Sequence, residues 1–281
     1  MSDPAGDVGN FDQNWRSTSE AHYLHWTRGE PANQIQLAFR QHWLTFQQLL
    51  GSDFSGRRIL EVGCGRGSLS AYFADAGWDC TLLDLSETAI DVAKKAFASN
   101  ALPARFDIGD CLNLPYADGS FDVVFSIGLL EHFEDIQTVI SEQSRVLAPG
   151  GMFIGYVVPE LPDNIQRDYN WICDLLKTLI PAQNVSQKAP VYRSDELSPK
   201  YLSAMQNAGI EDGQAKGTYP LPMISHSIAF PFTLLPEESE QILVSHFIQL
   251  LEQRRPTAPM NNPWLCDEGY GQAFLVWGQK A

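Results

Sequence analysis

Three glycines at alternate positions, preceded by an acid, form the segment of this chain best suited to hold a ligand. Residues 59–67 read I-L-E-V-G-C-G-R-G, so Glu61 stands two residues before the first glycine. Glycine tolerates positive φ and has no Cβ to keep a ligand away from the backbone. The apolar run predicts a buried strand, and residues 68–73 predict a helix that begins after the loop. A strand, a glycine loop and a helix N-terminus present backbone N–H groups to a ligand.

The spacing of the glycines separates two kinds of nucleotide ligand. A dinucleotide fingerprint is G-x-G-x-x-G, whereas the glycines here stand at positions 63, 65 and 67. Glu61 would lie unfavourably beside a pyrophosphate, because both groups are negatively charged. A carboxylate near the loop suits a ligand with a positive centre, and a dinucleotide-dependent oxidoreductase is the disfavoured alternative.

Two more acids follow apolar runs farther along the chain. Residues 81–86 predict a second strand with Asp84 at its end, where a carboxylate can accept hydrogen bonds from both hydroxyls of a ribose. Residues 104–110 predict a third strand ending at Asp110, whose side chain can accept a hydrogen bond from an exocyclic amine. Ser86 is the expected N-cap of a helix over residues 87–98. The expected ligand therefore combines a cationic arm, a ribose and an adenine.

Two further strands complete this part of the chain. Residues 120–128 predict a strongly apolar fourth strand, which leads into L-L-E-H-F-E-D at residues 129–135. A helix closes within R-V-L-A-P-G-G at residues 145–151, and residues 152–158 predict a fifth strand.

In the order and spacing of these segments, residues 55–160 resemble the class I S-adenosylmethionine (SAM)-dependent methyltransferases. The resemblance rests on EVGCGRG, LLDLS, GDCLNLPY before FDVVFS, LLEHFED and RVLAPGGMF. It implies an α/β fold, with a Rossmann-like, mostly parallel sheet of seven strands and helices on both faces. N-terminal helices and C-terminal insertions would form a lid. SAM would be the cofactor, and S-adenosyl-L-homocysteine (SAH) the product.

The same resemblance implies which residues hold each part of the cofactor. The residues that would hold the aminocarboxypropyl arm are Glu61, Gly63, Cys64 and Gly65, and those that would hold the ribose are Asp84 and Leu85. Asp110 and Cys111 would bind the adenine, and carbonyls around Ser126, Ile127 and Gly128 would bind the methionine amino group. The alternative for the two aspartates is that they are turn residues at strand ends.

Methyl transfer from a sulfonium is an in-line displacement in which charge disperses at the transition state. Positioning the nucleophile about 3 Å from the methyl group in a dry pocket supplies much of the acceleration. A general base is needed only when the nucleophile arrives protonated. His132 is the candidate base, since histidine titrates near neutral pH. The alternative is that it orients its loop or contacts the cofactor, and Glu131 and Glu134 are expected to cap a helix N-terminus.

The chain divides into four parts on this interpretation. Residues 1–14 are an expected disordered tail, residues 15–50 an N-terminal helical lid, and residues 51–160 the cofactor-binding core. Residues 161–281 hold the rest of the core with two substrate-binding insertions, at 161–192 and 220–268. A sixth strand over 210–219 and a seventh over 272–278 would form a hairpin that the second insertion interrupts. Helices are expected near residues 164–179, 194–209 and 236–254, the last with an apolar stripe of Ile242, Leu243, His246, Phe247, Leu250 and Leu251.

The lid segments supply the candidate substrate residues. Tyr23 and Trp26 stand in an aromatic-rich stretch and could cover the cofactor, the alternative being that they pack the helix onto the core. His226 lies in the second insertion and is also a candidate substrate residue, and His25 and His226 are weaker candidates than His132 for the base. The aromatic and proline-rich insertion fits either a lid over an apolar small molecule or an interface in a homodimer.

The composition limits the classes of partner and the cellular location that we expect for this protein. Nineteen Lys and Arg against 34 Asp and Glu give a net charge of −15, which argues against a nucleic-acid substrate. No run of about 18 apolar residues predicts a membrane span, and no signal-peptide core is seen at the start. Five cysteines without a CxxC pair favour reduced thiols in the cytoplasm. No metal-ligand spacing and no G-x-S-x-G occur, so metal-independent transfer is expected and a hydrolase is not.

The leading hypothesis is therefore a cytoplasmic SAM-dependent methyltransferase that acts on a small, apolar acceptor in a biosynthetic role. O-methylation is favoured, N- and C-methylation stay open, and a natural-product or quinone-like acceptor is expected. The alternatives are a SAM-fold protein that binds the cofactor for a non-methylating or regulatory role, and a protein methyltransferase.

Overall fold

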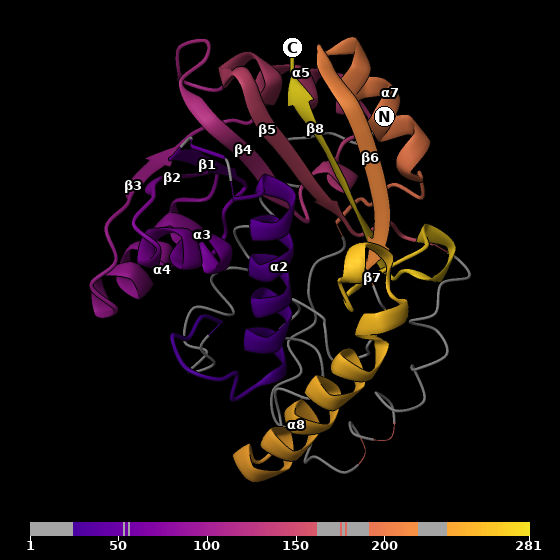
Figure 1. The fold of residues 1–281 in the computed structure, drawn as a ribbon. Helices are drawn as coiled ribbons and strands as arrows, with labels where there is room; N and C mark the ends of the chain where they lie inside the picture. The colour runs from indigo at the N-terminus through magenta and orange to yellow at the C-terminus, as the bar shows by residue number, and fades with distance from the viewer. Residues whose placement is uncertain are drawn as a thin grey trace.

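The fold is built on one sheet, shown in Figure 1 with helices on either side. A computed structural model describes residues 25–52, 54–55, 57–161, 175, 178, 191–218 and 235–281. Within these residues the sheet has eight strands in the order β3-β2-β1-β4-β5-β8-β6-β7. The strands are β1 (Arg58–Val62), β2 (Asp79–Asp84), β3 (Arg105–Ile108), β4 (Phe121–Ile127), β5 (Leu147–Val157), β6 (Ile210–Thr218), β7 (Leu265–Cys266) and β8 (Ala273–Lys280).

The order of the first five strands creates the place where a ligand can bind. β3, β2, β1, β4 and β5 are parallel, and the chain reverses its direction of progress across the sheet between β1 and β4. Connections leave β1 and β4 on opposite sides of this switch point, which opens a crevice at their carboxyl ends. The acids that the sequence places at strand ends are therefore brought to one edge of the sheet.

Helices cover both faces of the sheet, as the α/β expectation requires. One hydrophobic cluster joins the sheet to α2 (Gln34–Leu50), α3 (Ser68–Asp75), α4 (Glu87–Ser99) and α8 (Glu237–Arg254). A second cluster on the other face joins it to α5 (Ile136–Val146) and α7 (Ser198–Asn207). Short 3-10 helices occur at η1 (Leu130–His132), η4 (Arg255–Thr257), η5 (Pro259–Asn261) and η6 (Glu268–Tyr270). The Rossmann-like, mostly parallel fold class is confirmed.

Strand number is one point on which the sequence prediction is wrong. Seven strands were expected, and the eighth is β7, which comes from the second insertion. It has two residues and pairs with the end of β6, Thr218 opposite Leu265. A strand this short leaves no periodicity in the sequence. The interrupted hairpin is confirmed, because β6 and β8 pair antiparallel although the insertion separates them.

Helix boundaries follow local capping chemistry. The Ser86 side chain accepts a hydrogen bond from Ala89 N at 3.2 Å, so the predicted N-cap of α4 is confirmed. α7 begins at Ser198, four residues later than predicted, with a proline in its first turn. The Ser194 hydroxyl instead accepts the Glu196 N–H in a local turn. The N-cap of α5 is Asp135, which accepts from Thr138 N at 3.2 Å, whereas Glu131 is buried in η1 and does not cap this helix.

The apolar stripe of α8 is also displaced from its predicted position. The buried residues of this helix are Glu240, Val244, Phe247 and Leu251, whereas Ile242 is 72% exposed. Apolar side chains lie on more than one side of α8, so the sequence alone does not select a face. Packing against α2 selects the side that carries Phe247 and Leu251.

Several expectations lie outside the described residues. These are the tail over 1–14, Tyr23, His226 and the helix over 164–179, of which only Leu175 and Thr178 are described and helical. The division into a lid, a core and insertions stays a prediction. No helix in the described part of the chain is long and apolar enough to cross a membrane.

Replacing Gly67 tests how tightly the first loop is packed on the sheet. Gly67 has φ of +67°, and a Cβ there would lie 2.3 Å from Leu82 Cδ2 and 3.0 Å from Phe97 Cε2. We expect Gly67→Ala to lower the free energy of unfolding by about 2–4 kcal/mol, from left-handed strain plus overpacking. Gly209→Ala is the control, because Gly209 has φ of +77° with nothing within 4 Å of its Cβ position. It should cost about 1 kcal/mol. Equal losses in urea unfolding of the two variants would contradict the packing argument.

Candidate cofactor-binding site

The glycine loop after β1 is tied to the neighbouring strand. Gly63 N and Cys64 N donate hydrogen bonds to the Leu83 carbonyl at 2.8 and 3.0 Å. Gly63, Gly65 and Gly67 all have positive φ, which lets the chain turn from β1 into α3 within five residues. The loop therefore sits over the carboxyl end of β2.

Asp84 completes this attachment. Its Oδ2 accepts the Gly65 N–H at 2.8 Å, and its Oδ1 accepts the Ser86 N–H at 2.9 Å. Burial raises the pKa of this carboxyl, and the two backbone hydrogen bonds oppose the rise. Each carboxylate oxygen can accept a second hydrogen bond. Asp84 is thus held in one orientation at the sheet edge and keeps acceptor capacity for a pair of hydroxyls.

Two exposed apolar side chains flank Asp84. Leu85 follows it in the chain and is 44% exposed, and Ile108 pairs with Asp84 across β2 and β3 and is 53% exposed. Beyond β3, Asp110 is exposed, and its Oδ1 accepts the Leu112 N–H at 2.9 Å. Burial raises the pKa of Cys111 to about 12, so the thiol is neutral. An apolar surface beside one carboxylate is suited to the flat face and the amine of a base.

Glu61 lies beneath the loop. It is 3% exposed, and its Oε2 accepts hydrogen bonds from Ser70 Oγ at 2.5 Å and from Ser70 N at 3.3 Å. Burial raises the pKa of Glu61 to about 8, with the Ser70 hydrogen bonds opposing the rise. The carboxyl group therefore joins β1 to the first turn of α3, and it is mostly protonated at neutral pH.

The end of β4 brings the remaining predicted residues to the same edge. Ser126 is fully buried, and Gly128 has φ of +65° and donates its N–H to the Tyr156 carbonyl at 2.9 Å. His132 Nδ1 lies 2.6 Å from the Tyr192 carbonyl oxygen. A carbonyl only accepts, so Nδ1 carries the hydrogen, and the neutral ring has its lone pair on Nε2. The contact attaches η1 to the segment that returns from the first insertion.

The N-terminal segment crosses the start of α3. His25 Nδ1 is 3.1 Å from Ser68 Oγ, at the first residue of α3. Trp26 is partly buried and meets Tyr72 edge-on, with ring centroids 6.2 Å apart, and the Arg28 guanidinium lies 5.1 Å from its ring. Trp26 is thus packed on α3 close to the glycine loop. Both of the roles considered for it from the sequence remain compatible with this position.

One group of side chains was not foreseen from the sequence. His42 of α2 is fully buried between Tyr156 and Trp264, in edge-on contacts with centroid distances of 4.5 and 4.4 Å. Tyr156 and Trp264 are stacked at 5.9 Å. More than a hundred residues separate each of the three from the next, so no local pattern could have joined them. They place an aromatic cluster beneath the carboxyl end of β5.

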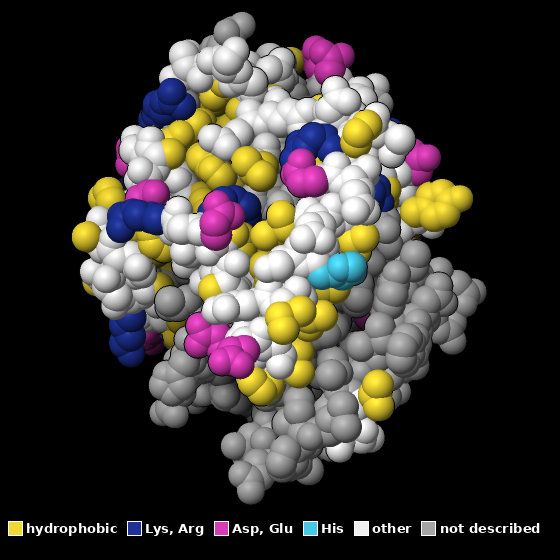
Figure 2. Space-filling view, turned by 60° about the horizontal axis from the view of Figure 1, so that its bottom comes forward, with side chains coloured by type: hydrophobic (Ala, Val, Ile, Leu, Met, Phe, Trp, Pro, Cys, Tyr) yellow, Lys and Arg dark blue, Asp and Glu magenta, His cyan; other side chains and the backbone are white. Residues whose placement is uncertain are grey.

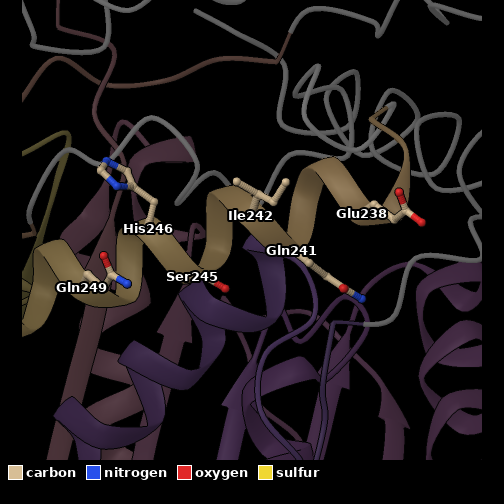
Figure 3. Close-up of a pocket in the computed structure, with 6 residues that line it drawn as sticks. All are labelled: Glu238, Gln241, Ile242, Ser245, His246 and Gln249. Atoms are coloured by element: carbon tan, nitrogen blue, oxygen red, sulfur yellow. The ribbon is translucent and has the colours of Figure 1, made fainter.

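One other hollow lies on the described part of the surface. A hollow on the exterior of α8 is lined by Glu238, Gln241, Ile242, Ser245, His246 and Gln249, all from one helix (Figure 3). On the face that Figure 2 shows, Lys and Arg side chains lie scattered among Asp and Glu without forming a basic patch. Among the described residues no three His, Cys, Asp or Glu side chains are grouped to hold a metal ion.

Comparison with known proteins identifies the core. Residues 60–155 match the family described as "Methyltransferase domain". Over 138 residues the chain is 36% identical to methyltransferase GfsG of Streptomyces halstedii, covering 48% of this chain and 49% of that protein. Over 101 residues it is 37% identical to norajmaline N-methyltransferase of Rauvolfia serpentina, covering 35% of each chain. The chain thus spans half or less of the length of these curated relatives.

A solved structure extends the likeness of fold to nearly the whole chain. A SAM-dependent methyltransferase of Thermotoga maritima, described as a possible histamine N-methyltransferase, aligns with a TM-score of 0.56 and 17% identity. The alignment covers 97% of this chain and 99% of that one. The fold agrees with the match of residues 60–155 to a methyltransferase domain, as the resemblance implied.

Replacing Glu61 tests the buried carboxyl under the loop. Its pKa is about 8 when folded and about 4.3 when unfolded, so the folded state holds a proton between these values. Stability should therefore fall by about 1.4 kcal/mol per pH unit as pH rises through this window. Glu61→Gln keeps the acceptor for Ser70 and removes this contribution, so urea unfolding at about pH 5, 6 and 7 should show a shallower decline.

The matched control is Glu252→Gln. Glu252 is exposed and paired with Arg255, which holds its pKa below the usual range and outside this window. It should leave the pH slope unchanged. An unchanged slope in Glu61→Gln would mean that Glu61 is ionised in the folded protein.

Proposed function

We propose that this chain transfers the methyl group of SAM to a small organic acceptor and releases SAH. The observation that carries the proposal is the shared attachment of the glycine loop and Asp84 at the switch point of the sheet. The 2.8 Å hydrogen bond from Gly65 N to Asp84 Oδ2 sets the loop and the ribose-accepting carboxylate side by side. The match of residues 60–155 to a methyltransferase domain supports the same conclusion.

The residues present fit the cofactor in three parts. Asp84 offers oxygens to a ribose, and Leu85 and Ile108 offer apolar surface to an adenine, with Asp110 and Cys111 beyond. The glycine loop and the carbonyls around Gly128 would hold the aminocarboxypropyl arm. The bound cofactor supplies an electrophilic methyl group. The protein's part is to fix the arm, align an acceptor and exclude water.

The curated relatives inform the acceptor only by its class. The curated relatives include proteins named as N-, O- and sterol C-methyltransferases. We propose a small apolar acceptor of the natural-product or quinone-like kind, with transfer to oxygen favoured. The aromatic cluster of His42, Tyr156 and Trp264 near the carboxyl edge supports an apolar environment. A net charge of −15 argues against a nucleic-acid acceptor.

We propose that His132 orients its loop, with the role of a base as the alternative that the lone pair on Nε2 leaves open. Its Nδ1–H is engaged with the Tyr192 carbonyl, which fixes the ring and the segment it holds. We also propose a cytoplasmic location, supported by the buried, unpaired thiols of Cys64, Cys80, Cys111 and Cys266. A homodimer formed through the second insertion is proposed as the alternative use of that segment.

Titration calorimetry with SAM, SAH and NADH tests the cofactor assignment. We expect SAM and SAH to bind and NADH not to bind. Asp84→Asn should weaken SAM by about 10- to 100-fold, because two charge-assisted hydrogen bonds to the ribose are lost. Asp79→Asn is the control, since Asp79 begins the same strand at the opposite, exposed end. NADH binding without SAM binding would overturn the proposed function, and unaltered affinity in Asp84→Asn would overturn the ribose assignment.

Three substitutions at position 132 separate orientation from base catalysis. Asn carries an N–H donor at the position of Nδ1, whereas Gln carries one nearer the position of Nε2. We expect Asn to keep stability within about 0.5 kcal/mol of the wild type, and Ala and Gln to lose about 1 kcal/mol with the hydrogen bond to Tyr192. With a phenolic acceptor that the wild type turns over, SAH formation should follow the same order. A base is indicated instead if Asn is as inactive as Ala and the pH profile loses its limb near 6.5.

A further inference from the structure

Glu131 is the most unusual polar side chain of the site. It lies in η1, just beyond β4, and it is 0% exposed. Among the described residues neither of its carboxylate oxygens has a hydrogen-bond partner. Burying an unpaired carboxylate costs several kcal/mol, so native proteins pair such groups or keep them neutral. The position calls for a positively charged or proton-bearing partner.

The surroundings of Glu131 show where that partner would lie. Glu131 Oε1 is 3.6 Å from the position that a Cβ on Gly128 would occupy, so the carboxyl group faces the backbone at the end of β4. Ser126 Oγ and Tyr201 OH are also buried without a hydrogen-bond partner among the described residues. The carbonyls at this strand end are the ones assigned to the methionine amino group. The unpaired acid therefore borders the part of the site proposed for the cationic arm.

Charged and titratable neighbours do not neutralise the carboxyl group. Arg193, an exposed residue of the segment returning from the first insertion, acts on it only through space. Tyr156 of β5 and Tyr201 of α7 both have pKa values raised by burial and are neutral. The backbone N–H groups of Glu131 itself and of Val158 also favour the charged form, but among the described residues neither carboxylate oxygen has a hydrogen-bond partner. Burial raises the pKa of Glu131 to about 7, and Arg193 and these N–H groups only moderate the rise.

We propose that Glu131 is the counter-charge for the positively charged arm of the cofactor, and that it gives up a proton when the cofactor binds. The inference rests on the proposed function. It differs from the assignment of this role to Glu61, because Ser70 donates two hydrogen bonds to Glu61, whereas no described residue donates a hydrogen bond to the Glu131 carboxylate. A cation placed against the carboxyl group favours its ionised form. The released proton goes to the solvent, and no covalent bond to carbon or sulfur is altered.

Calorimetry of the full chain measures this proton directly. SAM is titrated at about pH 6 into wild-type protein in buffers of different ionisation enthalpy, since the dependence on buffer gives the number of protons released. We expect release of more than about half a proton at this pH and affinity that rises between pH 5.5 and about 7. The ligand's own amino group stays protonated throughout this range, because its ordinary pKa is about 7.7.

Glu131→Gln should bind SAM about 10-fold more weakly at about pH 7.5 and should lose most of the proton release. Glu240→Gln is the matched control. Glu240 is also buried with a pKa raised to about 7, but it accepts the Gln34 N–H at 3.2 Å, between α8 and α2. Its replacement should leave both measurements unchanged.

SAH resolves the two positive centres, because it keeps the ammonium and lacks the sulfonium. Equal weakening of SAM and SAH assigns the ammonium, and weakening of SAM alone assigns the sulfonium.

The outcomes distinguish failure of the inference from failure of the proposed function. If wild-type protein does not bind SAM, the proposed function fails and the inference fails with it. If SAM binds but Glu131→Gln matches the wild type in affinity and proton release, only the inference is overturned. The buffer series on wild-type protein tests the inference without any variant. SAM binding without proton release at about pH 6 also overturns the inference.

Discussion

The structure depends on how one turn is held to one strand end. Three consecutive N–H groups of the glycine loop, from Gly63, Cys64 and Gly65, donate to acceptors at the end of β2. Two of them meet the Leu83 carbonyl, and the third meets the Asp84 carboxylate. β1 and β2 cannot shift relative to each other without breaking these bonds. The attachment also fixes the start of α3, because Gly67 is its N-cap and packs against Leu82. The loop and the acid thus share one arrangement before any ligand arrives.

This arrangement gathers carboxyl groups at one edge of the sheet, and each is stabilised differently. Asp84 is paired with backbone N–H groups, Glu61 with Ser70, and Glu131 with no described residue. Burial raises the pKa of all three, to about 8 for Glu61 and about 7 for Glu131. These raised pKa values are costly for folding, since each favours the unfolded state as pH rises. Sites that bind charged ligands tolerate this cost because ligand binding offsets it.

The core was predictable because its signals are local. The glycine loop, the acids at the ends of β1 and β2, and the Ser86 cap each occupy a few adjacent residues, and the structure places them together at the expected edge. Failures occurred where long-range packing decides. The buried side of α8 depends on α2, β7 has two residues, and His42 meets Trp264 across more than two hundred positions. The sequence predicts a cap at Glu131, because it shows an acid shortly before a helix. It does not show that the side chain of this acid is buried.

The turn at η1 carries Glu131 and also holds the segment that returns from the first insertion. Ser194 N donates to the Glu131 carbonyl at 2.7 Å, and His132 Nδ1 donates to the Tyr192 carbonyl. The segment returning from the first insertion is therefore held by the same three-residue turn that buries Glu131. A change in the ionisation of Glu131 and a change in the position of this segment act on one piece of backbone. The proposed counter-charge of the cofactor and the segment over residues 192–194 thus share one turn of backbone.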